Sequence, residues 1–326
     1  MIQDARTGEL RPFNFSSLTD QIPELGKFNL ALDSVTFSRP IDSSDMHPDN
    51  WIQLAEIIHK NYNKFSGFVI LHGSDTMAFT ASALSFMLEN LSKPVVLTGS
   101  QLPMGIVRTD GKENLITAIE IASATSNTGK PCVSEVCIYF EYRLYRGNRT
   151  FKYSSRDFHA FKSPNYPELA EAGVEINYNT TYIKSKVKNK FKVHLSLENE
   201  VAVLKMFPGI SKSVTESILF TPGIKAVILE TFGAGNCLTD NWFIELIKSV
   251  VDKGVIILNI TQCKDGRVVQ GMYQTSAHLL KAGVISGGDM TFEAALTKLM
   301  FLLGQKLSVN TVKKLLQKNI SGELTV

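Results

Sequence analysis

Cysteine and long apolar runs are both scarce in this chain of 326 residues. The cysteines form no Cys-x-x-Cys pair and lack the spacing of a metal finger. They are Cys132, Cys137, Cys237 and Cys263. No apolar run reaches the roughly 18 residues that a membrane-spanning helix needs, and the first residues lack the basic-then-apolar order of a signal peptide. We therefore expect a cytoplasmic protein with no membrane partner, whose cysteines stay reduced and pack as small core residues.

An excess of one charge is also missing. The 34 basic and 31 acidic residues give a net charge of +3, which is not the positive balance of a nucleic-acid-binding protein. One basic stretch stands out at 184–192, where every second residue is lysine. Such a stripe is typical of a solvated edge strand or linker, whereas a nucleic-acid stripe would need interleaved aromatic residues. We expect no nucleic-acid partner.

Short apolar runs alternate with helical patterns in the first half of the chain. The runs are typical of strands buried on both faces, and the segments between them repeat apolar residues every three or four positions. The expected strands are 67–72, 94–100 and 136–140, and the expected helices are 76–91 and 112–124. This alternation predicts a parallel sheet with helices on both faces.

The last third of the chain repeats the pattern. A helix is expected after Met290, capped by Asp289 or Thr291. The expected strands are 201–207, 226–229 and 255–259. The expected fold class is therefore α/β with two domains: a larger N-terminal parallel-sheet domain at 1–180, a linker at 181–200 where periodicity fades, and a smaller C-terminal α/β domain at 201–326.

The richest polar segment is His72-Gly73-Ser74-Asp75-Thr76, directly after the first of these strands. In open parallel sheets, ligands bind beyond the carboxyl ends of the strands. Ser74 and Asp75 are placed to act in catalysis there, or simply to cap the next helix, since both residue types are preferred N-caps. His72 is likewise either a hydrogen-bonded strand-end residue or a base.

Two more clusters leave alternatives open. Asp42-Ser43-Ser44-Asp45 precedes an amphipathic helix that starts near Pro48, and could hold the charged ends of an amino acid or cap that helix. The basic segment 143–152 is either a solvated loop or the source of a base, Lys152, if that amine lies beside the Ser–Asp pair. Phosphate-loop, dinucleotide and zinc-protease motifs are missing, so we expect no metal and no cofactor.

These motifs together resemble one family, the bacterial-type L-asparaginases of the cytoplasmic type I class. The resemblance rests on segments that occur in the same order along the chain. They are Asp42-Ser43-Ser44-Asp45-Met46, His72-Gly73-Ser74-Asp75-Thr76-Met77, Thr98-Gly99-Ser100-Gln101, Leu144-Tyr145-Arg146-Gly147-Asn148-Arg149-Thr150, Thr261-Gln262-Cys263 and Gly287-Gly288-Asp289-Met290-Thr291.

The resemblance implies an asparaginase-like fold that hydrolyses L-asparagine to aspartate and ammonia without a cofactor. A threonine hydroxyl attacks the side-chain amide and forms an acyl-enzyme, supported by a relay whose members here are Ser74, Asp75 and Lys152. The family usually has threonine at the Ser74 position. Asp42, Ser43 and Ser44 would hold the substrate's α-groups, with Ser74 beside them and Asp75 paired to its ammonium. Family members assemble as homodimers or homotetramers.

One departure from the family pattern is serious. The segment that carries the family's nucleophile, Thr-Gly-Gly-Thr-Ile-Gly on a first strand, does not occur in this sequence. The first residues resemble what normally follows it, with Thr7 in the loop that covers the site and Leu10 or Phe13 nearest to that loop's usual tyrosine. We expect this chain to hydrolyse asparagine slowly or not at all. The alternative is a non-catalytic protein that binds aspartate or asparagine.

A second asparagine site lies between the domains in some type I relatives, near the positions of Phe151, Glu230 and Cys263. Phe151 and Glu230 differ from the small polar and basic residues usual there. Cys263 is therefore a candidate allosteric residue, and the alternative is a buried thiol at a strand end.

Overall fold

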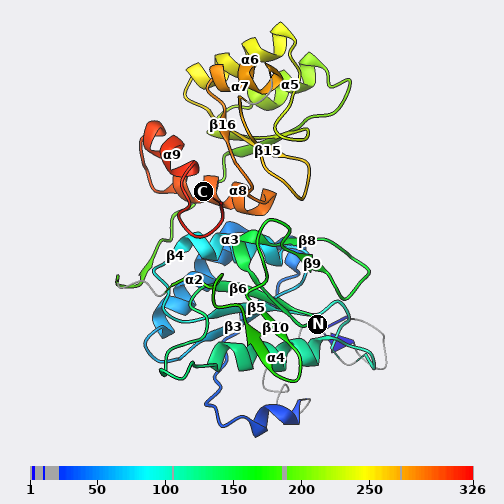
Figure 1. Ribbon diagram of the computed structural model, residues 1–326, viewed down its shortest axis with the longest axis vertical. Coiled ribbons are helices and arrows are strands. Elements are labelled where there is room, and N and C mark those ends of the chain that lie inside the picture. Colours follow the sequence, from blue (N-terminus) through cyan, green and yellow to red (C-terminus); the bar gives the residue numbers. More distant parts are fainter. Residues whose placement is uncertain are drawn as a thin grey trace.

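The computed structural model describes residues 2–3, 10–11, 22–104, 106–185, 189–271 and 274–325. Figure 1 shows two bodies, a lower one from the first half of the chain and an upper one from the second. Helix α8 (Phe292–Gly304) and the C-terminus lie between them. Beside the lower body, β1 (Ile2–Gln3) and β2 (Leu10–Arg11) form an antiparallel pair, and a short 3-10 helix, η2, covers Pro23–Lys27.

The lower body contains a six-stranded sheet in the order β11-β10-β7-β6-β5-β3. Neighbours among β3, β5 and β6 are parallel, and the other pairs are antiparallel. The bounds are β3 (Phe68–Leu71), β5 (Val95–Thr98), β6 (Val136–Phe140), β7 (Arg143–Arg146), β10 (Ala170–Ala172) and β11 (Ile176–Tyr178). The α/β class is confirmed, but the expectation of a wholly parallel sheet is wrong for the last three strands.

A tight turn between β6 and β7 explains the antiparallel half. Glu141 and Tyr142 have φ angles of 42° and 66°, and positive φ at both central residues matches a two-residue turn to the twist of a hairpin. Residues 143–146, expected in a basic loop, therefore form a strand that folds back on β6. The chain continues through the 3-10 helix η4 (Gly147–Arg149) into β8 (Phe151–Lys152), which pairs with β9 (Phe161–Lys162).

Three helices pack around the lower sheet: α2 (Pro48–Asn61), α3 (Met77–Met87) and α4 (Gly111–Ser123). Helix α3 is buried along almost its whole length, and it packs against both α2 and α8. It ends earlier than its apolar pattern predicts because the next residues form β4 (Leu88–Glu89), which pairs with β12 (Lys192–Val193).

The upper body has a four-stranded parallel sheet, β13-β14-β15-β16. Its strands are β13 (Val201–Lys205), β14 (Ala226–Thr231), β15 (Ile256–Thr261) and β16 (Ile285–Ser286). Helices α5 (Lys212–Leu219), α6 (Asn241–Asp252) and α7 (Gln274–Lys281) pack in one apolar core, while α8 and α9 (Val309–Leu316) pack in another. Of the two caps proposed for α8, Thr291 is the observed one, since its Oγ1 accepts from the Ala294 N–H at 3.1 Å.

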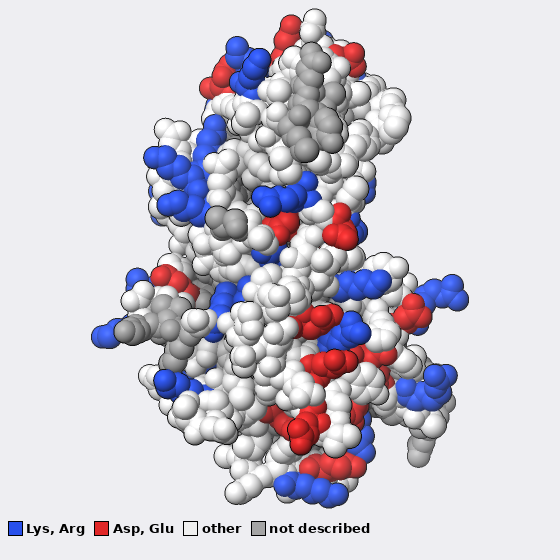
Figure 2. Space-filling model, in the orientation of Figure 1, with Lys and Arg blue, Asp and Glu red and all other residues white. Residues whose placement is uncertain are grey.

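The lysine stripe at 184–192 is not one solvated face. Lys186 and Lys188 lie outside the described residues, and Lys190 and Lys192 are exposed. Lys184 instead turns inward: its backbone N–H donates to Glu135 Oε1 at 2.9 Å and its Nζ to Ser321 Oγ at 3.3 Å. Figure 2 shows acidic side chains gathered over the lower body of this face and basic ones scattered. Among the described helices, none has the length and apolar character needed to span a membrane.

A buried ion pair ties the C-terminal tail to α8. Lys298 Nζ lies 2.6 Å from Glu323 Oε1, and neither side chain has any exposed surface. The ammonium also donates to the carbonyls of Leu316 and Lys318, at 3.0 and 2.6 Å. Burial lowers the pKa of Lys298, and the Glu323 carboxylate opposes that shift. The pair therefore holds the tail at the junction of the two bodies.

The substitution Glu323→Gln tests this pair. We expect a loss of about 3–5 kcal/mol of unfolding free energy, because the Lys298 charge stays buried without its counter-ion. Urea unfolding followed by fluorescence measures it. Glu216→Gln is the matched control, since the Lys212–Glu216 pair is exposed on both sides and such pairs contribute about 0.3–0.5 kcal/mol. Equal effects of the two substitutions would contradict the argument.

Candidate active site

Three segments meet beyond the carboxyl ends of β3 and β5. The turn 73–76 follows β3, Gln101 follows β5, and Lys152 ends β8. Lys152 Nζ donates to Ser74 Oγ at 2.8 Å and to Asp75 Oδ1 at 2.5 Å. The Lys152 side chain is 17% exposed and that of Asp75 is 64% exposed. A shielded amine thus faces a hydroxyl and an accessible carboxylate.

Ser74 and Asp75 do not cap the helix that follows them. Helix α3 begins at Met77, its N-cap is Thr76, and no side chain makes the capping hydrogen bond. Ser74 Oγ instead donates to Gln101 Oε1 at 3.0 Å, and Asp75 pairs with Lys152. Both side chains are therefore directed toward the lysine and not toward the helix end.

The Asp42 cluster lies against the same turn. Ser43–Asp45 form the 3-10 helix η3, which Asp42 caps by accepting from Ser44 N at 3.0 Å and Ser44 Oγ at 2.9 Å. These hydrogen bonds lower the pKa of Asp42. Asp42 and Ser44 are exposed, whereas Ser43 is buried. Thr76 Oγ1 donates to the Ser43 carbonyl at 2.5 Å, so η3 and the turn are held together.

Gly73 is required by this close contact. A Cβ at that position would lie 2.5 Å from Ser43 Oγ and 2.8 Å from Ser43 Cβ. Any larger residue would push η3 away from the turn. The motif's glycine thus serves the packing of two polar segments against each other.

Gln101 is a site residue that the sequence reasoning did not single out. Besides accepting from Ser74, it donates through Nε2 to the Asp157 carbonyl at 3.0 Å. Its own backbone N–H donates to the Asp110 carboxylate at 3.0 Å. Since the Ser74 proton is directed at Gln101, the Ser74 oxygen presents its lone pairs to Lys152. The sequence signal for Gln101 is the motif Thr98-Gly99-Ser100-Gln101, in which it follows directly after a strand.

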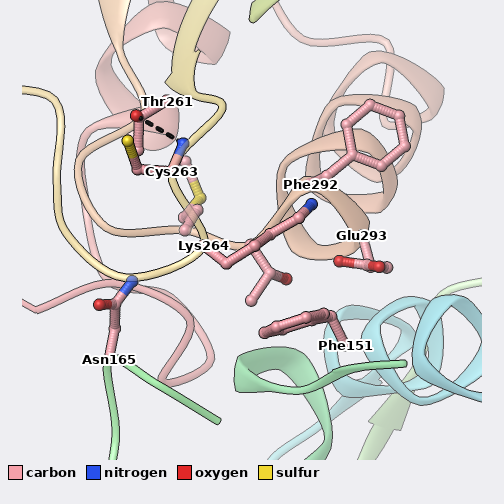
Figure 3. A pocket seen from close by; sticks show the side chains of 9 residues that line it. Phe151, Asn165, Thr261, Cys263, Lys264, Phe292 and Glu293 are labelled. Atoms are coloured by element: carbon pink, nitrogen blue, oxygen red, sulfur yellow. Dashed lines mark hydrogen bonds between the residues drawn. The ribbon is translucent and has the colours of Figure 1, made fainter. Parts of the chain in front are cut away.

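A cavity lies beside α8, where the two bodies meet and away from the contacts of Lys152 (Figure 3). Cys263 lines it and is exposed, so the alternative of a buried thiol is wrong. The cause is local: β15 ends at Thr261, and the Cys263 N–H donates to Thr261 Oγ1 at 3.0 Å in the turn that follows. Lys264 Nζ lies 5.4 Å from the centre of the Phe151 ring.

One carboxylate in the lining of this cavity has an unpaired oxygen. Glu293 Oε2 is buried without a hydrogen-bond partner, and burial raises the pKa of Glu293. Glu230 is not among the lining residues; it is buried and lies 3.8 Å from Lys205 Nζ.

The remaining residues named from the sequence lie elsewhere. Thr7 and Phe13 are outside the described residues, and Leu10 is in β2. Cys137 and Cys237 are buried and Cys132 is half-buried. In the part of the chain that the structure describes, no three His, Cys, Asp or Glu side chains are grouped to hold a metal ion.

Comparison with known proteins identifies the fold family. Residues 1–184 match the family model "Asparaginase, N-terminal", and residues 200–316 match "Glutaminase/Asparaginase C-terminal domain". The chain belongs to the asparaginase family. The resemblance that the motifs indicate is therefore confirmed.

Individual relatives are similar to this asparaginase-family chain over most of its length. L-asparaginase 1 of Escherichia coli (strain K12) is 45% identical over 285 residues, which are 87% of this chain and 82% of that protein. The crystal structure of L-asparaginase I from Vibrio cholerae superposes with a TM-score of 0.89 at 42% identity, covering 100% of this chain and 96% of the other. The 60 kDa lysophospholipase of Mus musculus is 45% identical over 287 residues, 87% of this chain and 50% of that protein.

The exposed thiol gives a direct test of this region. We expect dithiodipyridine to label Cys263 first in the folded protein, because Cys137 is buried and its burial raises the pKa of that thiol well above its usual value. Absorbance of the released thione follows the reaction. Cys263→Ser should remove the fast phase; a fast phase that persists in this variant would contradict the placement of Cys263.

Proposed function

We propose that this protein is an L-asparagine amidohydrolase whose substrate lies between the turn 73–76, η3 and Lys152. The proposal is supported above all by one observation: Lys152 Nζ is within hydrogen-bond distance of both Ser74 Oγ and Asp75 Oδ1. A titratable amine, a hydroxyl and a carboxylate in contact are the parts of a proton relay. Membership of the asparaginase family gives the relay its substrate.

The polar groups suit a free α-amino acid. Asp75 is exposed enough to meet an α-ammonium. The exposed Ser44 hydroxyl can turn from Asp42 to an α-carboxylate, and the Ser43 side chain lies against Gly73 in the same wall of the site. An arriving ammonium would compete with Lys152 for Asp75. Lys152 would then keep Ser74 Oγ as its remaining side-chain partner, in line for proton exchange.

The relay then balances as follows. As a threonine hydroxyl attacks the side-chain amide carbon, the Ser74 hydroxyl turns its proton from Gln101 toward the neutral amine of Lys152. Ser74 gives that proton to Lys152 while it takes up the threonine proton, and Lys152 passes its proton on to the leaving ammonia. Water repeats the transfer to release aspartate. Serine supplies the same hydroxyl as the threonine usual at this position. Amide groups of the turn 73–76 can stabilise the developing oxyanion, and one such donor is typically worth about 2.7–4 kcal/mol.

The Thr-Gly-Gly-Thr-Ile-Gly strand that carries the family's nucleophile does not occur in this sequence. We propose that this strand docks on the outer edge of β3. Among the described strands, β3 is the last of its sheet, and Leu71 on it is 45% exposed. A parallel strand there would end beside Ser74 and Asp75.

Ammonia release tests this proposal. We expect the 326-residue chain to hydrolyse asparagine at least about 10³-fold more slowly than the same chain preceded by a strand ending in Thr-Gly-Gly-Thr-Ile-Gly, since loss of a nucleophile removes most of catalysis. Lys152→Met in the longer chain should lower kcat by about 10²–10⁴-fold. Equal rates of the short and long chains would contradict it.

Binding of aspartate can be measured without turnover. Gly73→Ala should abolish detectable aspartate binding in calorimetry, because its Cβ would displace Ser43 from the turn. Gly26→Ala is the matched control, since a Cβ at Gly26 meets nothing within 4 Å. Unchanged affinity in Gly73→Ala would place the ligand elsewhere.

A non-catalytic aspartate- or asparagine-binding protein is the second candidate, favoured by the absence of the Thr-Gly-Gly-Thr segment. Aspartate binding without ammonia release from either chain would support it.

We also predict homodimeric or homotetrameric assembly, a cytoplasmic location and the domain boundaries 1–180, 181–200 and 201–326. Binding of a second asparagine near Cys263 is also a prediction. Two asparagine-binding sites per chain would support it, and a hyperbolic binding curve with one site per chain would argue against it.

A further inference from the structure

A line of hydrogen bonds runs from helix α2 to the turn that carries Ser74. Trp51 Nε1 donates to Thr80 Oγ1 at 2.9 Å, Thr80 Oγ1 lies 2.8 Å from His72 Nε2, and His72 Nδ1 lies 2.7 Å from the Gly73 carbonyl oxygen. Trp51 and Thr80 are buried. The line joins α2, α3 and the end of β3, and it contributes no atom to the relay itself.

The donor and the acceptor of each hydrogen bond in this line can be assigned from the groups at its two ends. An indole N–H can only donate and a carbonyl oxygen can only accept. Nδ1 of His72 must therefore carry a proton, because otherwise its lone pair would face that of the Gly73 carbonyl. Thr80 accepts from Trp51 and has its own proton left to donate to His72 Nε2. Burial also lowers the pKa of His72, which favours this neutral form.

The carbonyl that His72 holds belongs to the peptide bond between Gly73 and Ser74. Since a trans peptide is planar, its C=O and N–H point in opposite directions. Fixing the Gly73 carbonyl on the His72 side therefore turns the Ser74 N–H away from His72. The His72 backbone is anchored as well, because its N–H donates to the Thr98 carbonyl at 2.9 Å.

We propose that His72 is a positioning residue: held as the neutral Nδ1–H tautomer by Thr80 and Trp51, it fixes the Gly73–Ser74 peptide so that the Ser74 N–H faces the substrate. This inference rests on the proposed function for the identity of the substrate. It adds to that function a role for a histidine that touches neither Lys152 nor Asp75 in any described hydrogen bond. His72 is thus not the general base in this account.

Nitrogen NMR of the His72 ring tests the tautomer without any turnover. We expect Nδ1 to be protonated and Nε2 unprotonated at neutral pH. Thr80→Val keeps the shape of the side chain and removes the hydroxyl that faces Nε2, so the Nε2 resonance should lose the shift of a hydrogen-bonded acceptor. Thr80→Ser should restore it. Ser85→Ala is the matched control, since Ser85 is another buried hydroxyl of α3, bonded to the Ala81 carbonyl at 2.7 Å, and it should change nothing.

Aspartate affinity on the same samples tests the positioning. Thr80→Val should weaken binding by about fivefold to tenfold, the usual effect of one hydrogen bond, while Thr80→Ser and Ser85→Ala should bind like the parent chain. An Nε2–H tautomer in the parent chain, or full affinity in Thr80→Val once the hydrogen bond at Nε2 has been lost, would overturn the inference. Failure of the parent chain to bind aspartate would contradict the proposed function instead, and the tautomer would still decide how His72 is held.

Discussion

The contact between Lys152 and the Ser74–Asp75 pair is the interaction on which this site depends. It joins residues 78 and 77 positions apart in the sequence, and it brings the separate β8–β9 strand pair to the carboxyl ends of the parallel strands β3 and β5. A solvated lysine in a loop would have many conformations and no fixed partner. On β8, with its side chain mostly shielded, Lys152 is held in one direction.

The junction between the two bodies supports that position. Arg149, three residues before Lys152, is buried: it pairs with Asp289 at 2.9 Å and donates to the Gly322 carbonyl at 2.8 Å. Glu323, next in the tail, is bonded to Lys298 of α8. Charges buried at this level are costly unless paired, so the tail, α8 and η4 form one connected structure. The position of Lys152 thus depends on residues from the far end of the sequence.

The sequence predicted the elements whose signal is local. The apolar runs at 136–140 and 226–229 became strands, and Thr291 became a cap, because these depend on neighbouring residues alone. Through the family resemblance, the motifs also predicted that Ser74, Asp75 and Lys152 belong to one catalytic relay. The sequence alone could not decide whether Ser74 caps a helix or acts in catalysis. That choice depends on the hydrogen bond from Ser74 to Gln101, which is 27 positions away. Nor could the sequence show that Cys263 is exposed or that residues 143–146 form a strand, which the turn at Glu141 and Tyr142 determines.

If the turn 73–76, η3 and Lys152 surround one small amino acid, a crystal structure of the chain with bound aspartate will show it there. We expect the ligand's ammonium at Asp75, its α-carboxylate at Ser43 and Ser44, and Lys152 still in contact with Ser74. Aspartate bound away from these residues, or a Lys152 ammonium that has left both Ser74 and Asp75, would contradict it.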